Sequence, residues 1–375
     1  MIKPDKPRLC FVAPTTWSVL SGDRSINTVG GSEVQQSILA RAFAKRGYHV
    51  SMICMDYGQP EGIEIDGVHV LKVHTPQGGL PVLRFVHPRL TSVWAAMKRA
   101  DADIYYQRSC GAQTGYVAAF CRLHGRKFVY AAASDADFDP TMPLLRFRRD
   151  KAIYSWGLRH SHDIVVQNPT QVARCREVYD RVSVPVRSCY VPPAIYQADP
   201  RGYVLWVSTL RKLKQPEVFI ELARRLPQYR FRMVGGADHQ EYFDALRGLA
   251  EIVPNLDFAG FVPYADIERE FDGARLFVNT SKFEGFPNTF LQSWARGIPT
   301  VSFVDTGSSV NDHPVVNRVT SLDEMASVVQ DLMTNDASWR KVGTRCATCY
   351  ANQHSVQAVV GGYESIFEKL LAPYG

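Results

Sequence analysis

The sequence predicts an α/β protein with two doubly wound domains, each built on a mainly parallel sheet. Three observations support this prediction. The chain has 375 residues, more than one hydrophobic core usually holds. Short apolar runs alternate with helix-length amphipathic segments from one end to the other, and a Pro-containing polar stretch lies mid-chain. With 46% hydrophobic and 21% charged residues, the composition excludes a disordered or collagen-like chain.

The first half contains six short runs that are typical of buried strands. They lie at residues 9–13, 49–55, 104–107, 128–132, 164–166 and 186–191. Helix-length segments separate them, and the clearest is 33–46, where Val34, Ile38 and Ala42 form one apolar stripe before the stop signal Gly47. This alternation predicts parallel strands with helical crossovers.

The second half repeats the same alternation. Its expected strands are residues 204–207, 231–234, 256–258, 276–278 and 300–303, separated by helices such as 216–226. We place the domain boundary in the polar stretch that begins at Pro192 and Pro193. This boundary predicts an N-terminal domain of residues 1–192 and a C-terminal domain of 193–354. Residues 355–375 are expected to form a last helix that crosses back to the first domain. Because ligands of such sheets bind outside the carboxyl ends of the strands, we expect the site in a cleft between the domains.

The charge is distributed unevenly between the halves. Residues 1–190 carry 25 Lys and Arg against 16 Asp and Glu, whereas residues 191–375 carry 18 against 21. The positive first half predicts an anionic partner, either a phosphorylated substrate or an acidic membrane surface. Nucleic acid is not an expected partner, because no helix-turn-helix, zinc-finger spacing or RNA-binding aromatic signature accompanies the charge.

The sequence also indicates a cytoplasmic protein with reduced thiols. No run of about 18 apolar residues is present to cross a bilayer, and residues 1–8 lack the apolar core of a signal peptide. The eight cysteines are scattered, and the close pair Cys346 and Cys349 has no further ligands at zinc-site spacing. We therefore expect structural thiols and no metal ion.

Residues 282–299 predict a loop that leads into a helix. The segment follows the expected strand at 276–278, Pro287 suits a first helical turn, and Gly297 and Pro299 are stop signals. The backbone N–H groups and the dipole at such a helix start favour a phosphate or diphosphate.

Two polar side chains flank this expected anion site. Glu284 stands just before the helix, and Gln292 follows eight positions later, about two helical turns from Glu284. At that separation the two side chains can bracket an elongated ligand, and a nucleotide sugar has this shape.

These residues resemble the E-x7-E signature of the retaining, GT-B-fold glycosyltransferases of family four, with Gln292 in place of the usual second acid. Further segments fall where that family has its loops: Gly30-Gly31-Ser32-Glu33, Arg211 with Lys214, and Gly235-Gly236. The resemblance implies a GT-B fold, in which two Rossmann-like domains face a cleft. It implies transfer from a nucleotide diphosphate sugar to a saccharide or lipid-linked saccharide acceptor in glycan or polysaccharide biosynthesis. The transfer would retain the anomeric configuration and need no metal ion or other cofactor.

The resemblance also implies roles for individual residues. Glu284 would contact the donor sugar near the reacting carbon, and Gln292 would hydrogen-bond the nucleotide ribose. An amide can bind a hydroxyl, but it lacks the charge-assisted strength of a carboxylate. The remaining donor contacts are expected from the residues Gly235, Phe286, Asn288 and Thr289.

Arg211 and Lys214 follow the expected strand at 204–207. Two cations there would neutralise the charge that develops on a leaving diphosphate, a task otherwise given to a metal ion. Because the family's usual pair is more widely spaced, the assignment among Arg211, Lys212 and Lys214 stays open. The alternative is an ordinary basic surface loop.

Gly30 and Gly31 precede the helix expected at 33–46, and Ser32 with Gln35 fits a capping box. Glycines at a helix start let the backbone approach a phosphate closely, so we expect contact with phosphate or acceptor. The G-x-G-x-x-G spacing and a Walker lysine are absent from the sequence, which argues against NAD and ATP.

Asp135 follows a strand of the first half and is expected to project into the cleft, near the position where many family members have a histidine. Asp135 and Asp137 together also resemble the metal-binding D-x-D motif of the other glycosyltransferase fold. The cationic pair and the two-domain pattern make a metal ion unnecessary, so we interpret this similarity as coincidence.

Residues 82–89 and 144–151 mix apolar with basic side chains. Such stretches can lie on an anionic bilayer, which would place the protein peripherally on the inner face of the membrane. Alternatively, their apolar side packs into the domain.

Two other functions share the same expected donor site. One is a non-catalytic nucleotide-sugar-binding partner of a glycan assembly system, and the other is a GT-B sugar epimerase. The base, sugar and acceptor are set by loops whose side chains vary on a constant scaffold, so the sequence does not name them.

Overall fold

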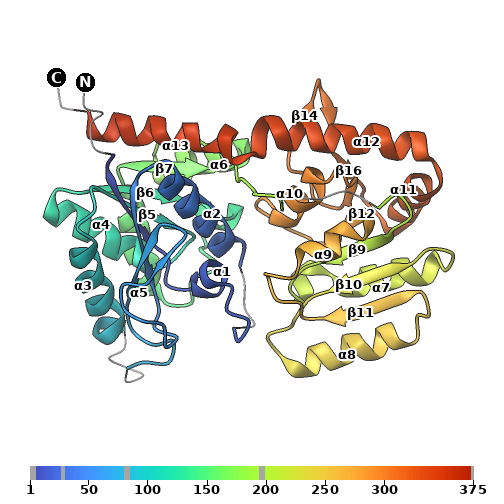
Figure 1. Cartoon of the computed structure of the whole chain (residues 1–375), viewed down its shortest axis with the longest axis horizontal. Coiled ribbons are helices and arrows are strands. Elements are labelled where there is room, and N and C mark those ends of the chain that lie inside the picture. The colour runs from blue at the N-terminus through green and yellow to red at the C-terminus, as the bar shows by residue number, and fades with distance from the viewer. Residues whose placement is uncertain (1–5, 27–29, 80–84, 194–198, 373–375) are drawn as a thin grey trace. The chain divides into compact units, whose positions relative to one another are not determined.

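The computed structural model describes residues 6–26, 30–79, 85–193 and 199–372. The chain divides into two compact units, one of Met1–Cys189 with Val356–Gly375 and the other of Tyr190–Ser355 (Figure 1). The second unit begins three residues before the predicted boundary. Within the predicted linker, residues 194–198 lie outside the described residues.

An eight-stranded sheet forms the centre of the first unit, in the order β3-β4-β2-β1-β5-β6-β7-β8. All neighbours are parallel except β3 and β4 at one edge. Strands β5 and β7 are buried along their whole length, including the polar residues Gln107 and Arg108 at the end of β5 and Asp163 at the start of β7. The strands are β1 (Arg8–Val12), β2 (His49–Cys54), β3 (Glu64–Ile65), β4 (Val68–Lys72), β5 (Ile104–Arg108), β6 (Lys127–Ala131), β7 (Asp163–Val166) and β8 (Val184–Pro185).

Helices cover this sheet. They are α1 (Trp17–Ser21), α2 (Gly31–Lys45), α3 (Thr91–Ala100), α4 (Gln113–His124), α5 (Arg148–Arg159) and α6 (Pro169–Tyr179), with the short turns η1 (Phe85–Leu90) and η2 (Asp135–Phe138). The predicted stripe on α2 is confirmed, since Val34, Ile38 and Ala42 are buried. Helix α13 (Val356–Leu371), at the end of the chain, lies beside α2 (Figure 1). The ring of Phe367 there lies 5.2 Å from that of Phe43.

Two local predictions in this unit are wrong. The capping box does not form, because α2 begins at Gly31 and Ser32 therefore lies inside its first turn. Gln35 is instead buried and bonds the backbone of Cys189, donating from Nε2 to the carbonyl oxygen at 2.6 Å and accepting its N–H at 2.9 Å. The strand expected at 186–191 does not form either. The backbone groups of this segment form other hydrogen bonds. The N–H of Cys189 donates to Gln35, and the N–H of Tyr190 donates to the carbonyl oxygen of His354 at 3.1 Å.

The second unit is built on a six-stranded parallel sheet in the order β11-β10-β9-β12-β13-β16. Numbered along the unit, this is the 3-2-1-4-5-6 order of a Rossmann fold, in which the strand order reverses between β9 and β12. The strands are β9 (Tyr203–Val207), β10 (Phe231–Val234), β11 (Leu256–Gly260), β12 (Ala274–Asn279), β13 (Thr300–Ser302) and β16 (Val316–Arg318), and β14 (Ser309–Val310) pairs with β15 (His313–Pro314). The helical segments are η3 (Lys212–Lys214), α7 (Pro216–Arg225), α8 (Gln240–Glu251), α9 (Glu268–Asp272), α10 (Asn288–Ala295), α11 (Leu322–Thr334), α12 (Asp336–Cys349) and η4 (Tyr350–His354).

None of the described helices is both long enough and apolar enough to span a bilayer.

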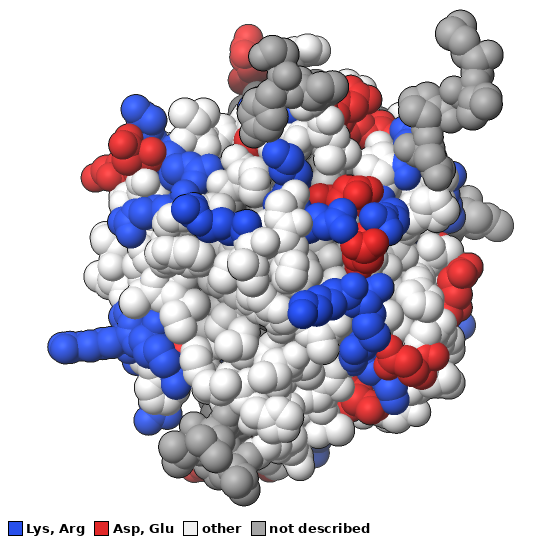
Figure 2. Space-filling model, turned by 90° about the vertical axis from the view of Figure 1, so that its left-hand side faces the viewer, with Lys and Arg blue, Asp and Glu red and all other residues white. Residues whose placement is uncertain are grey.

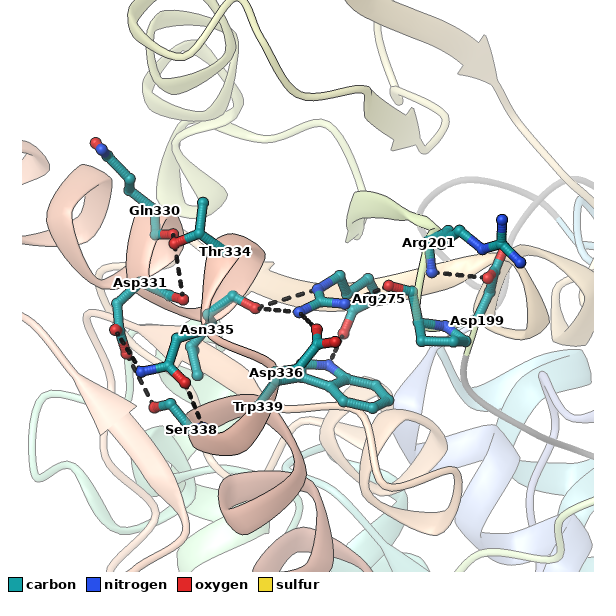
Figure 3. A network of polar contacts seen from close by, with 12 residues as sticks. Asp199, Arg201, Arg275, Gln330, Asp331, Thr334, Asn335, Asp336, Ser338 and Trp339 are labelled. Atoms are coloured by element: carbon teal, nitrogen blue, oxygen red, sulfur yellow. Dashed lines mark hydrogen bonds and ion pairs between the residues drawn. The ribbon is translucent and has the colours of Figure 1, made fainter.

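Arg275, a buried arginine on β12, forms hydrogen bonds with several parts of the second unit (Figure 3). Arg275 is 4% exposed, and its Nε and Nη2 donate to the carbonyl oxygen of Leu332 at 3.1 and 3.0 Å. Nη2 also lies 2.8 Å from Oδ1 of Asp336, and Nη1 donates to the carbonyl oxygen of Pro200. The guanidinium lies 5.0 Å from the ring of Trp339, whose Nε1 donates to the carbonyl oxygen of Arg275 at 2.8 Å. Arg275 thus donates hydrogen bonds to the C-terminal end of α11, to the start of α12 and to the segment before β9.

We expect Arg275→Met to lower the free energy of unfolding by about 2–4 kcal/mol, because it leaves buried carbonyl oxygens without donors. Urea unfolding measures this loss. Arg340→Met removes an exposed arginine from α12, the helix whose start Arg275 contacts, and is expected to change stability by less than about 0.5 kcal/mol. Equal midpoints for the two variants would contradict the role of Arg275.

Candidate functional site

The loops that follow β9 and β12 lie together at the carboxyl edge of the second sheet. The two strands are parallel neighbours, so their C-terminal ends reach the same edge. Thr280, just after β12, fixes the contact between the loops: it accepts a bond from Nε1 of Trp206 at 2.9 Å and donates to the carbonyl oxygen of Lys214 at 2.7 Å. This edge lies at the point where the strand order reverses, which is where open α/β sheets bind ligands.

Glu284 and Lys214 meet there in an ion pair. Lys214 Nζ lies 2.6 Å from Oε1 of Glu284, and the side chains are only 19% and 14% exposed. The same oxygen accepts bonds from Oγ of Ser281 at 2.6 Å and from Nδ2 of Asn279 at 3.4 Å. Among the described residues, none donates to the other oxygen, Oε2. The carboxylate is therefore held firmly by one oxygen while the second stays available as an acceptor.

Arg211 lies apart from this pair. Its guanidinium bonds Oδ2 of Asp238 at 2.8–3.0 Å, and both side chains are at least half exposed. Such an exposed pair contributes little energy. Lys212 is also exposed. Of the three candidate cations, Lys214 is the one that contacts Glu284.

Helix α10 begins at Asn288, so Pro287 precedes the first helical residue instead of occupying the first turn as predicted. Asn288 and Thr289 form the first turn and are partly exposed. Phe286 is 9% exposed, with its ring 5.9 Å from that of Trp294 and 4.8 Å from that of His354. This packing leaves little of the Phe286 ring for the ligand contact that the sequence suggested.

Gln292 is buried on α10 and bonds an acid that the sequence reasoning missed. Its Nε2 donates to Oε1 of Glu268, at the start of α9, at 2.9 Å. Oε2 of Glu268 in turn accepts a bond from Nη2 of Arg296 at 2.9 Å and one from the hydroxyl of Tyr190. Burial and the Glu268 carboxylate raise the pKa of Tyr190, so this hydroxyl stays a donor. No spacing rule connects Glu268 with Gln292, because only the packing of α9 against α10 brings them together.

The glycines proposed for ligand contact lie at the carboxyl edges of the sheets, and for Gly235 a close backbone contact requires glycine. Gly30 caps α2, and a Cβ there would lie 2.2 Å from Oε2 of Glu33; Gly31 is the first helical residue. Gly235 follows β10, and a Cβ would lie 2.0 Å from the carbonyl oxygen of Ser208. Close backbone approach therefore explains Gly235 whether or not a ligand binds.

Asp135 lies in the first unit, at the start of η2. Its Oδ1 accepts bonds from Nδ2 of Asn168 at 3.1 Å and from Nε2 of Gln171 at 2.9 Å. These two amides fix the carboxylate after β6, at the carboxyl edge of the first sheet.

Asp137 is buried completely, unlike Asp135. Its Oδ2 accepts bonds from the hydroxyl of Tyr130 at 3.1 Å and from the N–H of Ala133 at 2.7 Å. Burial raises the pKa of Asp137, because the charged form is poorly solvated there. The two carboxylates thus have separate partners, and no group of three metal-ligating side chains occurs within the described part of the chain.

Comparison with known proteins assigns the two parts of the chain to glycosyltransferase families. Residues 30–194 match the model of the glycosyl transferase 4-like domain, and residues 201–335 match that of glycosyl transferases group 1. The chain is 27% identical over 169 residues to O-antigen chain mannosyltransferase B of Escherichia coli. That match covers 43% of this chain and only 44% of the relative's own length.

Solved structures resemble the whole chain. Sucrose-phosphate synthase from Thermosynechococcus elongatus superposes with a TM-score of 0.78 at 15% identity, covering 96% of this chain and 98% of that one. The catalytic domain of starch synthase IV from Arabidopsis thaliana, bound to ADP and acarbose, gives 0.67 at 10% identity, covering 97% and 98%. Two glycosyltransferase domain models thus match consecutive parts of the chain, and the similar structures have the two-domain GT-B fold. The predicted GT-B fold of two Rossmann-like domains is therefore confirmed. In this glycosyltransferase fold the group 1 segment contains Lys214, Glu268, Glu284 and Gln292, whereas the 4-like segment contains Gly30 and Asp135.

The raised pKa of Asp137 predicts a pH-dependent stability. Because the folded-state pKa lies above the ordinary value of 3.8, Asp137 contributes most at acid pH, and this contribution falls as the pH rises through the folded-state pKa. Asp137→Asn keeps an acceptor for Tyr130 and Ala133 without the buried charge. We expect the variant to gain stability relative to the parent protein as the pH rises from 4 to 8, measured by urea unfolding.

Asp139→Asn is the matched control. The pKa of the Asp139 carboxyl is lowered by bonds from Thr141, so this substitution should lose stability relative to the parent at higher pH. A parallel pH trend for the two variants would contradict the assignment.

Proposed function

We propose that this protein transfers a sugar from a nucleotide diphosphate sugar to an acceptor hydroxyl in glycan biosynthesis. The observation that carries the proposal is the shielded Lys214–Glu284 pair beside the N-terminus of α10. The two glycosyltransferase family matches support it, as do the relative named for an O-antigen chain and the similar synthase structure that holds ADP with acarbose.

In this proposal the diphosphate binds between Lys214 and the first turn of α10. An ammonium has three N–H donors, and Glu284 takes one of them. The first backbone N–H groups of a helix and the positive end of its dipole favour an anion, and α10 presents Asn288 and Thr289 there. As the bond to the sugar breaks, these groups would stabilise the charge that accumulates on the leaving diphosphate. Arg211 would contribute less, because Asp238 already pairs with it.

Glu284 would position the donor sugar. Ser281, Asn279 and Lys214 hold Oε1, and Oε2 is the oxygen that can accept a sugar hydroxyl. The role matches the first acid of the E-x7-E signature, which supports assignment to the retaining family four. In a retaining reaction the leaving oxygen would deprotonate the acceptor on the same face of the sugar, and no metal ion is needed in this scheme.

Gln292 and Glu268 would recognise the ribose together. The amide of Gln292 is tied to Oε1 of Glu268, so the pair presents a carboxylate near the position where the signature usually has one. Glu268 would thereby supply the charge-assisted acceptor that Gln292 lacks. Gly30, Gly31 and Asp135 in the first unit are proposed for the acceptor side.

We expect Lys214→Met to lower kcat about 100- to 1000-fold with a smaller change in KM, because the lost cation acts mainly on charge developing in the transition state. The assay incubates the protein with a panel of nucleotide sugars and a saccharide acceptor and measures release of the nucleoside diphosphate. Lys212→Met, which removes an exposed cation two residues away, should stay near the parent rate.

Glu284→Gln should abolish transfer while the protein still folds, because the amide keeps an oxygen for Lys214 and Ser281. A modestly lower thermal unfolding midpoint is expected, since the shielded Lys214 loses its carboxylate partner. Near-normal turnover by either Glu284→Gln or Lys214→Met would refute the proposed site. Donor binding without any nucleotide release by the parent protein would instead favour a non-catalytic binding partner.

A charge swap tests the Gln292–Glu268 pair. Gln292→Glu restores the family's usual acid, yet we expect it to cost about 1–3 kcal/mol of stability, because it removes a hydrogen bond and puts two carboxylates side by side. Adding Glu268→Gln should recover most of that loss and keep nucleotide affinity, measured by thermal unfolding with and without nucleoside diphosphate. If the single variant is as stable as the parent, the pairing is wrong.

A further inference from the structure

Helix α5 and the residues before it expose large apolar side chains on the first unit. Leu144 is 55% exposed and Phe147 53%, while Trp156, two turns further on, is 39% exposed. Val86, in η1, is 52% exposed. Exposed apolar groups that cluster on one surface mark interaction sites more often than single ones do.

The exposed side of α5 is fixed by how its other side packs. Tyr154, Gly157 and Leu158 are buried, and a Cβ on Gly157 would lie 2.5 Å from the backbone nitrogen of Gly115 in α4. This close helix contact leaves no freedom to rotate α5. The opposite face therefore has to present Arg148 and Trp156, together with Arg159, to solvent.

The same surface is strongly basic. Residues 141–160 contain five Lys and Arg and a single acid, Asp150, which already pairs with Arg149 at 3.0 Å. Within the described ranges no carboxylate lies at ion-pair distance from Arg146 or Arg148. Figure 2 shows that Lys and Arg gather in groups on one face of the molecule, some of them with few acidic residues nearby.

Contacts between cations and rings link η1 to the start of α5. The guanidinium of Arg149 lies 3.4 Å from the ring centre of Phe85, which joins η1 to α5. Arg146 lies 5.5 Å from the ring centre of Phe147. We call Val86, Leu144, Arg146, Phe147, Arg148 and Trp156 the basic aromatic patch.

We propose that the basic aromatic patch docks the protein onto an anionic lipid bilayer. Phe147, Leu144 and Trp156 would enter the interfacial region, where aromatic rings are favoured, and the arginines would bind lipid phosphates. The charge selects an anionic partner, and large apolar side chains exposed on and beside a helix suit the interfacial region of a bilayer. The inference goes beyond the proposed transfer reaction and does not depend on it. Residues 82–84 of the predicted basic stretch lie outside the described residues, and Trp156 is an addition from the structure.

Vesicle flotation tests the proposal with the full chain. The parent protein should float with vesicles of phosphatidylcholine and phosphatidylglycerol, not with phosphatidylcholine alone, and added salt should weaken binding. Arg146→Gln with Arg148→Gln should lower the partition coefficient roughly 30-fold, at about 1 kcal/mol for each arginine. Binding that does not depend on phosphatidylglycerol would overturn the proposal.

A matched pair of variants separates docking from general surface change. Phe147→Ser with Arg148→Gln alters the patch, whereas Leu249→Ser with Arg247→Gln removes one exposed apolar and one basic side chain from α8. Only Phe147→Ser with Arg148→Gln should lose flotation. Both double variants should have the unfolding midpoint of the parent protein. Equal flotation of the two variants would also overturn the proposal.

Two further readouts complete the test. Brominated lipids should quench the fluorescence of the parent more than that of Trp156→Phe, and equal quenching would contradict insertion of Trp156. Glu284→Gln should float like the parent, so docking and the proposed catalytic role can fail separately.

Discussion

The second unit depends on one shielded ion pair that joins two loops from distant parts of its sequence. Lys214 and Glu284 lie 70 residues apart and meet only because β12 is placed beside β9 in parallel register. Either charge would be costly in this largely dehydrated position without the other. Thr280 fixes the backbone of the Lys214 loop, so the two loops act as one element. The extra bond from Ser281 to Oε1 means that the Glu284 carboxylate keeps a donor when an anionic ligand competes for Lys214.

The sequence predicted the elements of this arrangement well but not its contacts. Strands such as β6 and β12 are buried and contain the apolar runs 128–131 and 276–278, and α10 has a proline before it and a glycine after it. Such signals are local, so they can be found without the fold. Two contacts could not be predicted in this way. The bond between Lys214 and Glu284 depends on strand order, and the bond between Gln292 and Glu268 depends on helix packing. No local sequence pattern indicates either. The false strand at 186–191 failed for the same reason, since its backbone bonds distant partners.

The Gln292–Glu268 contact explains why an amide can occupy a position that usually holds an acid in the resembled family. Glu268 accepts bonds from Gln292, Arg296 and Tyr190, of which Arg296 is the one cation. A second carboxylate at position 292 would leave two negative charges facing the single cation of Arg296, whose Nε also bonds Asp272 at 2.8 Å. A neutral amide at position 292 therefore suits a site whose carboxylate lies on α9.

The uneven charge of the chain has different structural origins in the two units. In the second unit many arginines bond the unit's own acids: Arg232 pairs with Glu270, and Arg225 with Glu221. The proposed binding of a diphosphate there relies on local geometry at Lys214 and α10, since the net charge of that half is negative. In the first unit the arginines around α5 exceed the acids near them, so their field extends into solvent. Such an exposed positive field attracts an extended anionic surface effectively. It holds a small ligand less well, because the arginines that produce it do not enclose a binding site. The proposed site at Lys214 and α10 therefore suits a small anionic ligand, whereas the basic aromatic patch suits an anionic surface.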